Sequence, residues 1–176
     1  MLKYTLAFIL HGDSMLMLLR VKAPNAFLLN GVGGKIKPGE TPYQGALREI
    51  REEVGIDIGD VRFAGTVTWD GAAETSDGGM YVYLGFWPEE ATPSAVAKRC
   101  THEGTLDWFP VDYIVTNPGN TVVGNIPHFL PQMLSVMGAD NPPQRHHCHY
   151  RERTLVEVDH MPLSAETLSE AGGDPA

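Results

Sequence analysis

Residues 41–55 constrain the fold of this chain most, because they carry the start and stop signals of a helix. Thr41 is a typical N-cap, Pro42 suits the first helical position, Gln44 completes a capping box and Gly55 is a typical C-terminal stop. One face of the predicted helix is apolar, with Tyr43, Leu47, Ile50 and Val54. Three acidic residues occupy roughly the opposite face: Glu49, Glu52 and Glu53. The pattern predicts a helix that packs on one side and presents carboxylates on the other.

Apolar, β-prone segments surround this helix and predict a sheet. Segments 2–10 and 15–21 flank a turn and predict an opening hairpin, and further strands are expected at 35–37, 61–69, 80–87, 105–109 and 149–158. A loop is expected at 70–79. Segment 124–137 has helical spacing, although Pro127 and Pro131 confine the expected regular part to its later turns. Residues 1–160 are therefore expected to form one α/β domain, followed by a mobile tail at 161–176 that is poor in aromatic residues.

Composition limits the classes of function. The chain has 176 residues, 43% hydrophobic and 20% charged, which predicts a globular fold. Its formal charge of −9 disfavours nucleic acid and anionic membranes as partners, and no obligate protein partner is evident. Cys100 and Cys148 match neither a disulfide framework nor a paired metal motif, and we find neither an export signal nor a membrane-spanning segment, so a cytoplasmic location is expected.

The glutamates of the predicted helix repel one another at their spacings of three and four residues. Solvent and Arg48, four residues before Glu52, offset part of this repulsion, as on many acidic surface helices. A divalent cation would offset it better, since carboxylate oxygens suit Mg²⁺, with Mn²⁺ as the alternative. The helix by itself does not decide between these two interpretations.

The residues around the helix resemble a complete Nudix box. Gly34 is followed by Glu40, then by Arg48-Glu49-Ile50, Glu52-Glu53 and Gly55-Ile56, so that all nine fixed positions over 23 residues match. The lead-in from Leu29 to Ile36 is similar to that of the MutT type, which includes enzymes acting on 8-oxo-dGTP. The resemblance implies an α/β/α sandwich around a mixed sheet. It also implies hydrolysis of a nucleoside triphosphate to a monophosphate and pyrophosphate.

Roles for the box residues follow from the resemblance and from the chemistry of phosphoryl transfer, which needs positioning and charge neutralisation. The expected metal ligands are Glu52, Glu53 and Glu49, with the Gly34 carbonyl as a further one. Arg48 is expected to orient the carboxylates and Glu40 to brace the loop. Glu49 and Glu53 are both candidates for the general base, and Glu103 is expected to reach the metals from a later loop.

Candidate nucleotide contacts lie outside the helix. Asn30 suits a purine edge, but an Asn-Gly turn explains it equally well. Asn125 stands where the 8-oxo-dGTP enzymes carry acidic residues, which leaves that specificity open. Lys35 and Lys22 are candidates for phosphate, and Phe27 or Trp69 for stacking on the base. These candidates leave the preferred base undetermined.

Three further interpretations concern other sites and substrates. In the tract His146-His147-Cys148-His149, a strand places only His147 and His149 on one face, and two ligands do not make a structural zinc site. ADP-ribose or a dinucleoside polyphosphate is the alternative substrate class. A non-catalytic nucleotide-binding module is the alternative to an enzyme, although such a module should have lost a box carboxylate.

Overall fold

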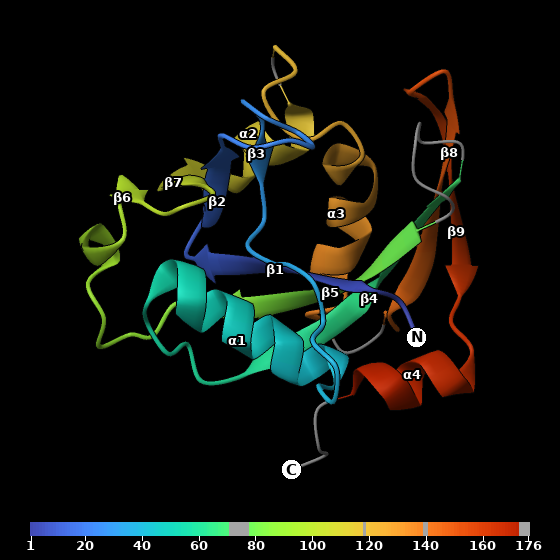
Figure 1. Ribbon diagram of the computed structural model, residues 1–176, viewed down its shortest axis with the longest axis horizontal. Coiled ribbons are helices and arrows are strands. Elements are labelled where there is room, and N and C mark those ends of the chain that lie inside the picture. Colours follow the sequence, from blue (N-terminus) through green and yellow to red (C-terminus); the bar gives the residue numbers. More distant parts are fainter. Residues whose placement is uncertain (71–77, 118, 139–140, 173–176) are drawn as a thin grey trace.

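The computed structural model describes residues 1–70, 78–117, 119–138 and 141–172 (Figure 1). Its helices and strands, in chain order, are β1 (Tyr4–His11), β2 (Ser14–Arg20), β3 (Leu29–Asn30), α1 (Pro42–Val54), β4 (Val61–Asp70), β5 (Gly78–Phe86), a 3₁₀ turn (Pro93–Ala95), β6 (Arg99–Cys100), β7 (Gly104–Pro110), α2 (Val111–Thr116), α3 (Ile126–Ser135), β8 (Gln144–Arg151), β9 (Thr154–Pro162) and α4 (Ala165–Ala171). The expected opening hairpin and the strands near 61–69, 80–87 and 105–109 are all present. The expected loop at 70–79 lies mostly outside the described residues.

The strands form one mixed sheet in the order β6-β7-β2-β1-β5-β4-β8-β9, with β3 paired to β2. The pairs β1–β5 and β4–β8 are parallel, and the other pairs are antiparallel. Central strands such as β2 are buried on both faces, which explains their nearly continuous apolar sequence.

Helices cover both faces of this sheet, as the α/β/α expectation requires (Figure 1). On one face, Ala46, Ile50 and Val54 of α1 pack with Ile9, Tyr83 and other sheet residues. On the other face, the core contains Phe8, Met17 and Leu84 of the sheet, Ile114 of α2, and Phe129 and Met133 of α3. Across the described ranges, no helix is long and apolar enough to span a membrane.

The caps predicted for α1 are present. The Thr41 hydroxyl accepts a hydrogen bond from the Gln44 backbone N–H, and the Gln44 side chain accepts one from the Thr41 N–H, which completes the capping box. Gly55 adopts a left-handed conformation with φ of 75°, which favours glycine, and its N–H donates to the Arg51 carbonyl. Local sequence therefore determines where α1 begins and ends.

The glycine-rich segment before α1 lies along the first half of β1. Backbone N–H groups of Thr5 and Ala7 donate to the carbonyls of Gly34 and Val32 at 2.9 and 2.6 Å. The strand expected at 35–37 is reduced to a single bridge between Lys35 and Tyr4. A Cβ on Gly33 would lie 2.2 Å from the Thr5 carbonyl oxygen, so this close approach requires glycine.

The prediction that the prolines confine the helix at 124–137 to its later turns is wrong. Helix α3 runs from Ile126 to Ser135 and includes both prolines. Pro127 lies in the first turn, where no intrahelical N–H is needed. Pro131 lies inside the helix, and complete burial of Phe129, Leu130 and Met133 against the sheet offsets the hydrogen bond that it lacks.

The single strand expected at 149–158 is a hairpin of β8 and β9. Its turn residues, Glu152 and Arg153, have φ values of 49° and 68°, which is typical of a tight turn with two left-handed residues. Asparagine and glycine are the usual residues at such positions, so Glu-Arg gave no turn signal. The hairpin extends the sheet beyond β4.

The segment expected to be a mobile tail contains α4. Ser164 caps this helix through a hydrogen bond from the Thr167 N–H, and Ala171 is fully buried in the core beneath α1. The Tyr83 hydroxyl donates to the Ala171 carbonyl at 2.9 Å, and Tyr81 donates to Glu170 at 2.6 Å. Residues 165–171 therefore complete the α1 face of the sheet.

Candidate active site

Glu53 is buried, whereas the sequence placed it on the face opposite the core. Glu53 is only 2% exposed to solvent, whereas the side chain of Glu52, one residue earlier, is 50% exposed. Small residues cause the difference: α1 approaches the sheet through Gly45 and Ala46, and Glu53 lies seven residues after Ala46 on the same side. The expectation that all three glutamates point away from the core is wrong for Glu53.

Burial and neighbouring charges raise the pKa of Glu53 to about 8. Desolvation contributes most, and the charges of Glu103 and Glu49 add to it. The Gly33 backbone N–H donates a hydrogen bond to this carboxyl. Its Oε2 atom has no hydrogen-bond partner in the described part of the chain. The charges of Glu49 and Glu103 thus act on a buried carboxyl oxygen that a proton, a cation or another hydrogen-bond donor would satisfy.

Arg48 holds the surrounding carboxylates. Its guanidinium donates to both oxygens of Glu40, to Glu49 at 2.7 Å and to the Lys35 carbonyl at 3.1 Å. A longer contact of 3.3 Å reaches Glu52. Hydrogen bonding by Arg48 lowers the pKa of Glu40 to about 2, and the Lys37 N–H also donates to Glu40. Arg48 and Glu40 therefore tie α1 to the loop in front of it.

Glu52 lies at the exposed margin of this cluster. The Lys37 ammonium lies 3.2 Å from its carboxylate and lowers its pKa, together with Arg48. Glu52 therefore shares Arg48 with Glu49 but turns toward solvent, while Glu53 turns inward.

Gly34 touches the Glu49 carboxylate closely. A Cβ at Gly34 would lie 2.5 Å from Glu49 Oε1, so a larger residue there would displace the Glu49 carboxylate. The Gly34 carbonyl accepts the hydrogen bond from Thr5 and keeps a second lone pair. The glycine-rich segment and α1 are in contact here.

Glu103 reaches the cluster from the loop before β7. Its carboxylate pairs with Arg20 at 3.0 Å, and its carbonyl accepts from the Val21 N–H. Its charge contributes to the raised pKa of Glu53, which places it close to that carboxyl. Segments 20–21, 33–34, 48–53 and 103 are thus brought together from four parts of the chain.

The two candidate base-reading residues lie on adjoining segments. The Leu29 N–H donates to the Thr121 carbonyl, and the Val123 N–H donates to the Leu29 carbonyl, so segments 29–30 and 121–125 lie side by side. Asn30 and Asn125 follow these paired residues in their segments. The Asn30 side-chain oxygen accepts from the Gly31 N–H, and Asn30 lies in strand β3 rather than in a turn. Asn125 is buried with its Oδ1 unpartnered among the described residues, and its amide contacts the Cys148 sulfur at 3.9 Å.

The other expected substrate contacts are exposed. Lys22 and Phe27 lie in the loop between β2 and β3, and the Phe27 side chain is 79% exposed. Lys35 is exposed beside the glycine-rich segment. Trp69 is partly buried and packs in the α3 core, as its strand position suggested.

Two contacts at the centre were not predicted, the pairing of Arg20 with Glu103 and the hydrogen bond from the Gly33 N–H to Glu53. Arg20 ends an apolar strand, and a basic residue there gave no specific signal. Gly33 belongs to the glycine-rich segment before α1. That segment was the only sequence feature that pointed to a close backbone contact at Gly33. Both act through Glu53 or Glu103, so they were detectable only once the segments were assembled.

A family model described as the NUDIX domain matches residues 2–132. An oxidized purine nucleoside triphosphate hydrolase of Mus musculus is 33% identical over 76 residues, 42% of this chain and 49% of that protein. An 8-oxo-dGTP diphosphatase of Proteus vulgaris is 47% identical over 38 residues, 22% of this chain and 34% of that protein. The matched regions thus span half or less of these relatives.

Solved structures share the fold. The MutT protein of Bacillus halodurans superposes with a TM-score of 0.68 at 19% identity, covering 91% of this chain and 97% of that one. The NUDIX domain of Shewanella oneidensis NrtR, solved with ADP ribose, gives a TM-score of 0.57 at 16% identity and covers 77% and 87%. At these identities the likeness concerns the fold alone. Because the domain model covers most of the chain, and the box residues surround one buried carboxyl, the chain belongs to the Nudix family.

Proposed function

We propose that this protein is a Mg²⁺-dependent pyrophosphohydrolase that converts a nucleoside triphosphate to a nucleoside monophosphate and pyrophosphate. One observation carries the proposal most: the buried, unpartnered Oε2 of Glu53 lies next to the carboxylates of Glu49 and Glu103. Such an arrangement is unfavourable by itself and becomes favourable when a cation binds.

The residues present fit a divalent cation with oxygen ligands. Glu49, Glu52, Glu53 and Glu103, with the second lone pair of the Gly34 carbonyl, supply the hard donors that Mg²⁺ prefers, and Mn²⁺ accepts the same set. When bound, the cation would neutralise charge on the phosphate oxygens and acidify water.

The chain's own groups have separable roles in this proposal. Arg48 and Glu40 position the carboxylates from the loop side. Glu53 is the favoured general base through the carboxyl oxygen that the cation leaves free, whereas Glu49 Oε1 already accepts from Arg48. Glu49 remains the alternative base. Arg20 neutralises part of the charge on Glu103.

Triphosphates are favoured as substrates because both curated relatives act on them by name. Asn30 and Asn125 would contact the base from their adjoining segments, Lys35 and Lys22 the phosphates, and Phe27 a ring face. Base preference, including 8-oxo-dGTP, depends on those contacts. The free thiols of Cys100 and Cys148 agree with a reducing, cytoplasmic compartment.

The test is product analysis on a nucleotide panel with Mg²⁺ that includes dGTP, 8-oxo-dGTP, other triphosphates and ADP-ribose. We expect monophosphate and pyrophosphate from at least one triphosphate, and no turnover in EDTA. Preferred cleavage of ADP-ribose would replace the substrate class, and tight nucleotide binding without cleavage would identify a binding module.

Glu53→Gln should lower turnover by about 10²- to 10⁴-fold. The matched control is Glu89→Gln, at an exposed carboxylate outside the cluster, which should retain normal turnover. Near-normal turnover by a folded Glu53→Gln variant would refute the role given to Glu53.

A further inference from the structure

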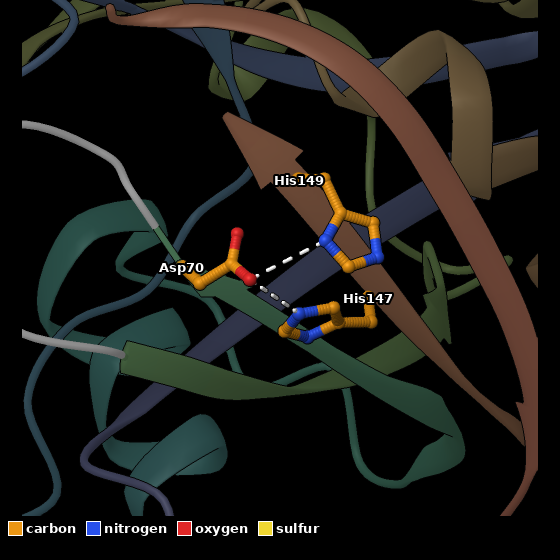
Figure 2. A group of neighbouring side chains, drawn as sticks. All are labelled: Asp70, His147 and His149. Atoms are coloured by element: carbon orange, nitrogen blue, oxygen red, sulfur yellow. Dashed lines mark hydrogen bonds and ion pairs between the residues drawn. The ribbon is translucent and has the colours of Figure 1, made fainter. Parts of the chain in front are cut away.

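A second cluster of metal-ligating side chains lies outside the glutamate site. Asp70 from β4 and His147 and His149 from β8 point toward one another (Figure 2). Asp70 Oδ2 lies 3.3 Å from His147 Nε2 and 3.3 Å from His149 Nδ1. One potential ligand atom from each residue lies within 4.8 Å of the other two.

Strand register brings these residues together. Thr68 pairs with His147 and Asp70 with His149 in the parallel β4–β8 ladder, which places all four side chains on the α1 face. Trp69 and Cys148 alternate with them and pack in the opposite core. The sequence correctly placed His147 and His149 on one face, but it missed Asp70, which is 77 residues from His147. The conclusion that only two ligands meet there is wrong.

Hydrogen-bond arithmetic at His149 requires a positive charge, which either a second ring proton or a bound metal ion can supply. Its Nε2 faces the Asp159 carboxylate at 2.9 Å, while its Nδ1 faces Asp70 at 3.3 Å. A neutral imidazole has one N–H, so it can donate to one carboxylate, and its other nitrogen presents a lone pair. Two acceptors at that distance repel each other unless a proton or a metal ion lies between them.

Distances in the cluster match a coordination sphere. Zn²⁺ binds imidazole nitrogen and carboxylate oxygen at about 2.0–2.1 Å, so neighbouring ligand atoms of a tetrahedral site are separated by roughly 3.3 Å. The distances from Asp70 Oδ2 to His147 Nε2 and to His149 Nδ1 both have this value. A small adjustment of the side chains would therefore seat an ion.

The outer nitrogens of both histidines are also engaged. His147 Nδ1 lies 2.7 Å from the Thr68 hydroxyl, and His149 Nε2 lies 2.9 Å from Asp159. Metal-ligating histidines usually carry such a partner on the nitrogen that does not bind the metal, because it fixes the ring and its tautomer. Thr68 and Asp159 supply these partners here.

We propose that Asp70, His147 and His149 form a binding site for a divalent transition metal, with Zn²⁺ as its preferred probe. Two imidazoles with one carboxylate favour such ions over Mg²⁺, which prefers oxygen ligands. In the sheet, β1 and β5 separate β2, which carries Arg20, from β4, so the two centres lie roughly 15–20 Å apart at ordinary strand spacing. The metal would join β4 to the β8–β9 hairpin.

Zn²⁺ titration by calorimetry in saturating Mg²⁺ tests the proposal, because Mg²⁺ occupies oxygen sites and leaves imidazole sites free. A Cys100→Ser background removes an exposed thiol that competes for zinc. We expect one Zn²⁺ per chain and, by NMR, shifts of the imidazole nitrogens of His147 and His149. Asp159→Asn should weaken binding about 10- to 100-fold, and Asp70→Asn or His149→Gln at least as much.

His128→Gln is the matched control, since His128 is exposed on α3 and outside the cluster. Its Zn²⁺ affinity should equal that of the parent, and circular dichroism should show that every variant is folded. Equal affinity in the parent and in folded Asp70→Asn would overturn the proposal. So would a lack of Zn²⁺ binding together with doubly protonated His149 in NMR, because a proton would then be the cation between the two carboxylates.

Discussion

Replacing Glu53 with glutamine should make the metal-free protein more stable, and increasingly so as pH rises. The folded-state pKa of about 8 exceeds the ordinary value of 4.5, so the folded protein retains a proton that the unfolded chain releases between these values. The free energy of unfolding therefore falls as pH rises, by about 1.4 kcal/mol per pH unit for this one group. Glutamine keeps the shape and has no such proton.

From pH 5 to pH 8 the stability difference, variant minus wild type, should grow by about 3.5 kcal/mol, because the slope is smaller near each of the two pKa values. Other groups titrate in this range. Burial lowers the pKa of His146 to about 4, and Asp159 raises the pKa of His149. Both occur in wild type and variant alike, so the difference isolates Glu53.

Urea unfolding in EDTA, followed by tryptophan fluorescence at several pH values, measures this difference. Glu52→Gln is the control, since the pKa of exposed Glu52 is lowered and its substitution should give a difference that stays flat above pH 5. Saturating Mg²⁺ should stabilise wild type and have a smaller effect on Glu53→Gln. A pH-independent difference between Glu53→Gln and wild type would refute the inference that Glu53 is buried and protonated.

Two further changes test the packing around the site. Gly34→Ala places a Cβ against the Glu49 carboxylate and should lower kcat about 10²-fold. The control is Gly124→Ala, which should leave kcat unchanged because nothing lies within 4 Å of the added Cβ. Equal kcat values for the two variants would contradict the close contact at Gly34. Ending the chain after Leu163 removes α4 and orphans the buried Tyr83 hydroxyl, so unfolding in urea should show a loss of about 2–4 kcal/mol. Adding Tyr83→Phe to the shortened chain should restore about 1 kcal/mol or more of the free energy of unfolding, because it removes the unpaired hydroxyl. A further loss of stability in this double variant would show that the lost hydrogen bond is not what destabilises the shortened chain.

Local signals were sufficient for α1 and for most strands. Thr41, Gln44 and Gly55 act within one turn of the helix end that each defines, so no tertiary information was needed. The sequence did not predict which face of α1 is buried. The apolar side chains predicted a buried face centred near Leu47 and Val54. In the structure, the small residues Gly45 and Ala46 allow a closer approach to the sheet, and the buried face is rotated by roughly 60° about the helix axis. Burial of Glu53 follows from that rotation.

Non-local contacts account for most of the other differences. Helix α4 has a polar sequence, and its end is held against the sheet by hydrogen bonds from Tyr81 and Tyr83, more than eighty residues earlier. Asp70 joins His147 and His149 only because β4 pairs with β8. Arg20 and Glu103 meet across the β2–β7 pairing. No local pattern in the sequence encodes these pairings.

Arg48 bears on whether folding of the protein depends on metal binding. Its guanidinium acts as a built-in counter-charge, bound to Glu40 and Glu49. Under the proposed function, we expect a chain with this counter-charge to fold with or without magnesium. Maturation and activation then become separate steps, unlike in small zinc domains, which stay unfolded until their metal arrives.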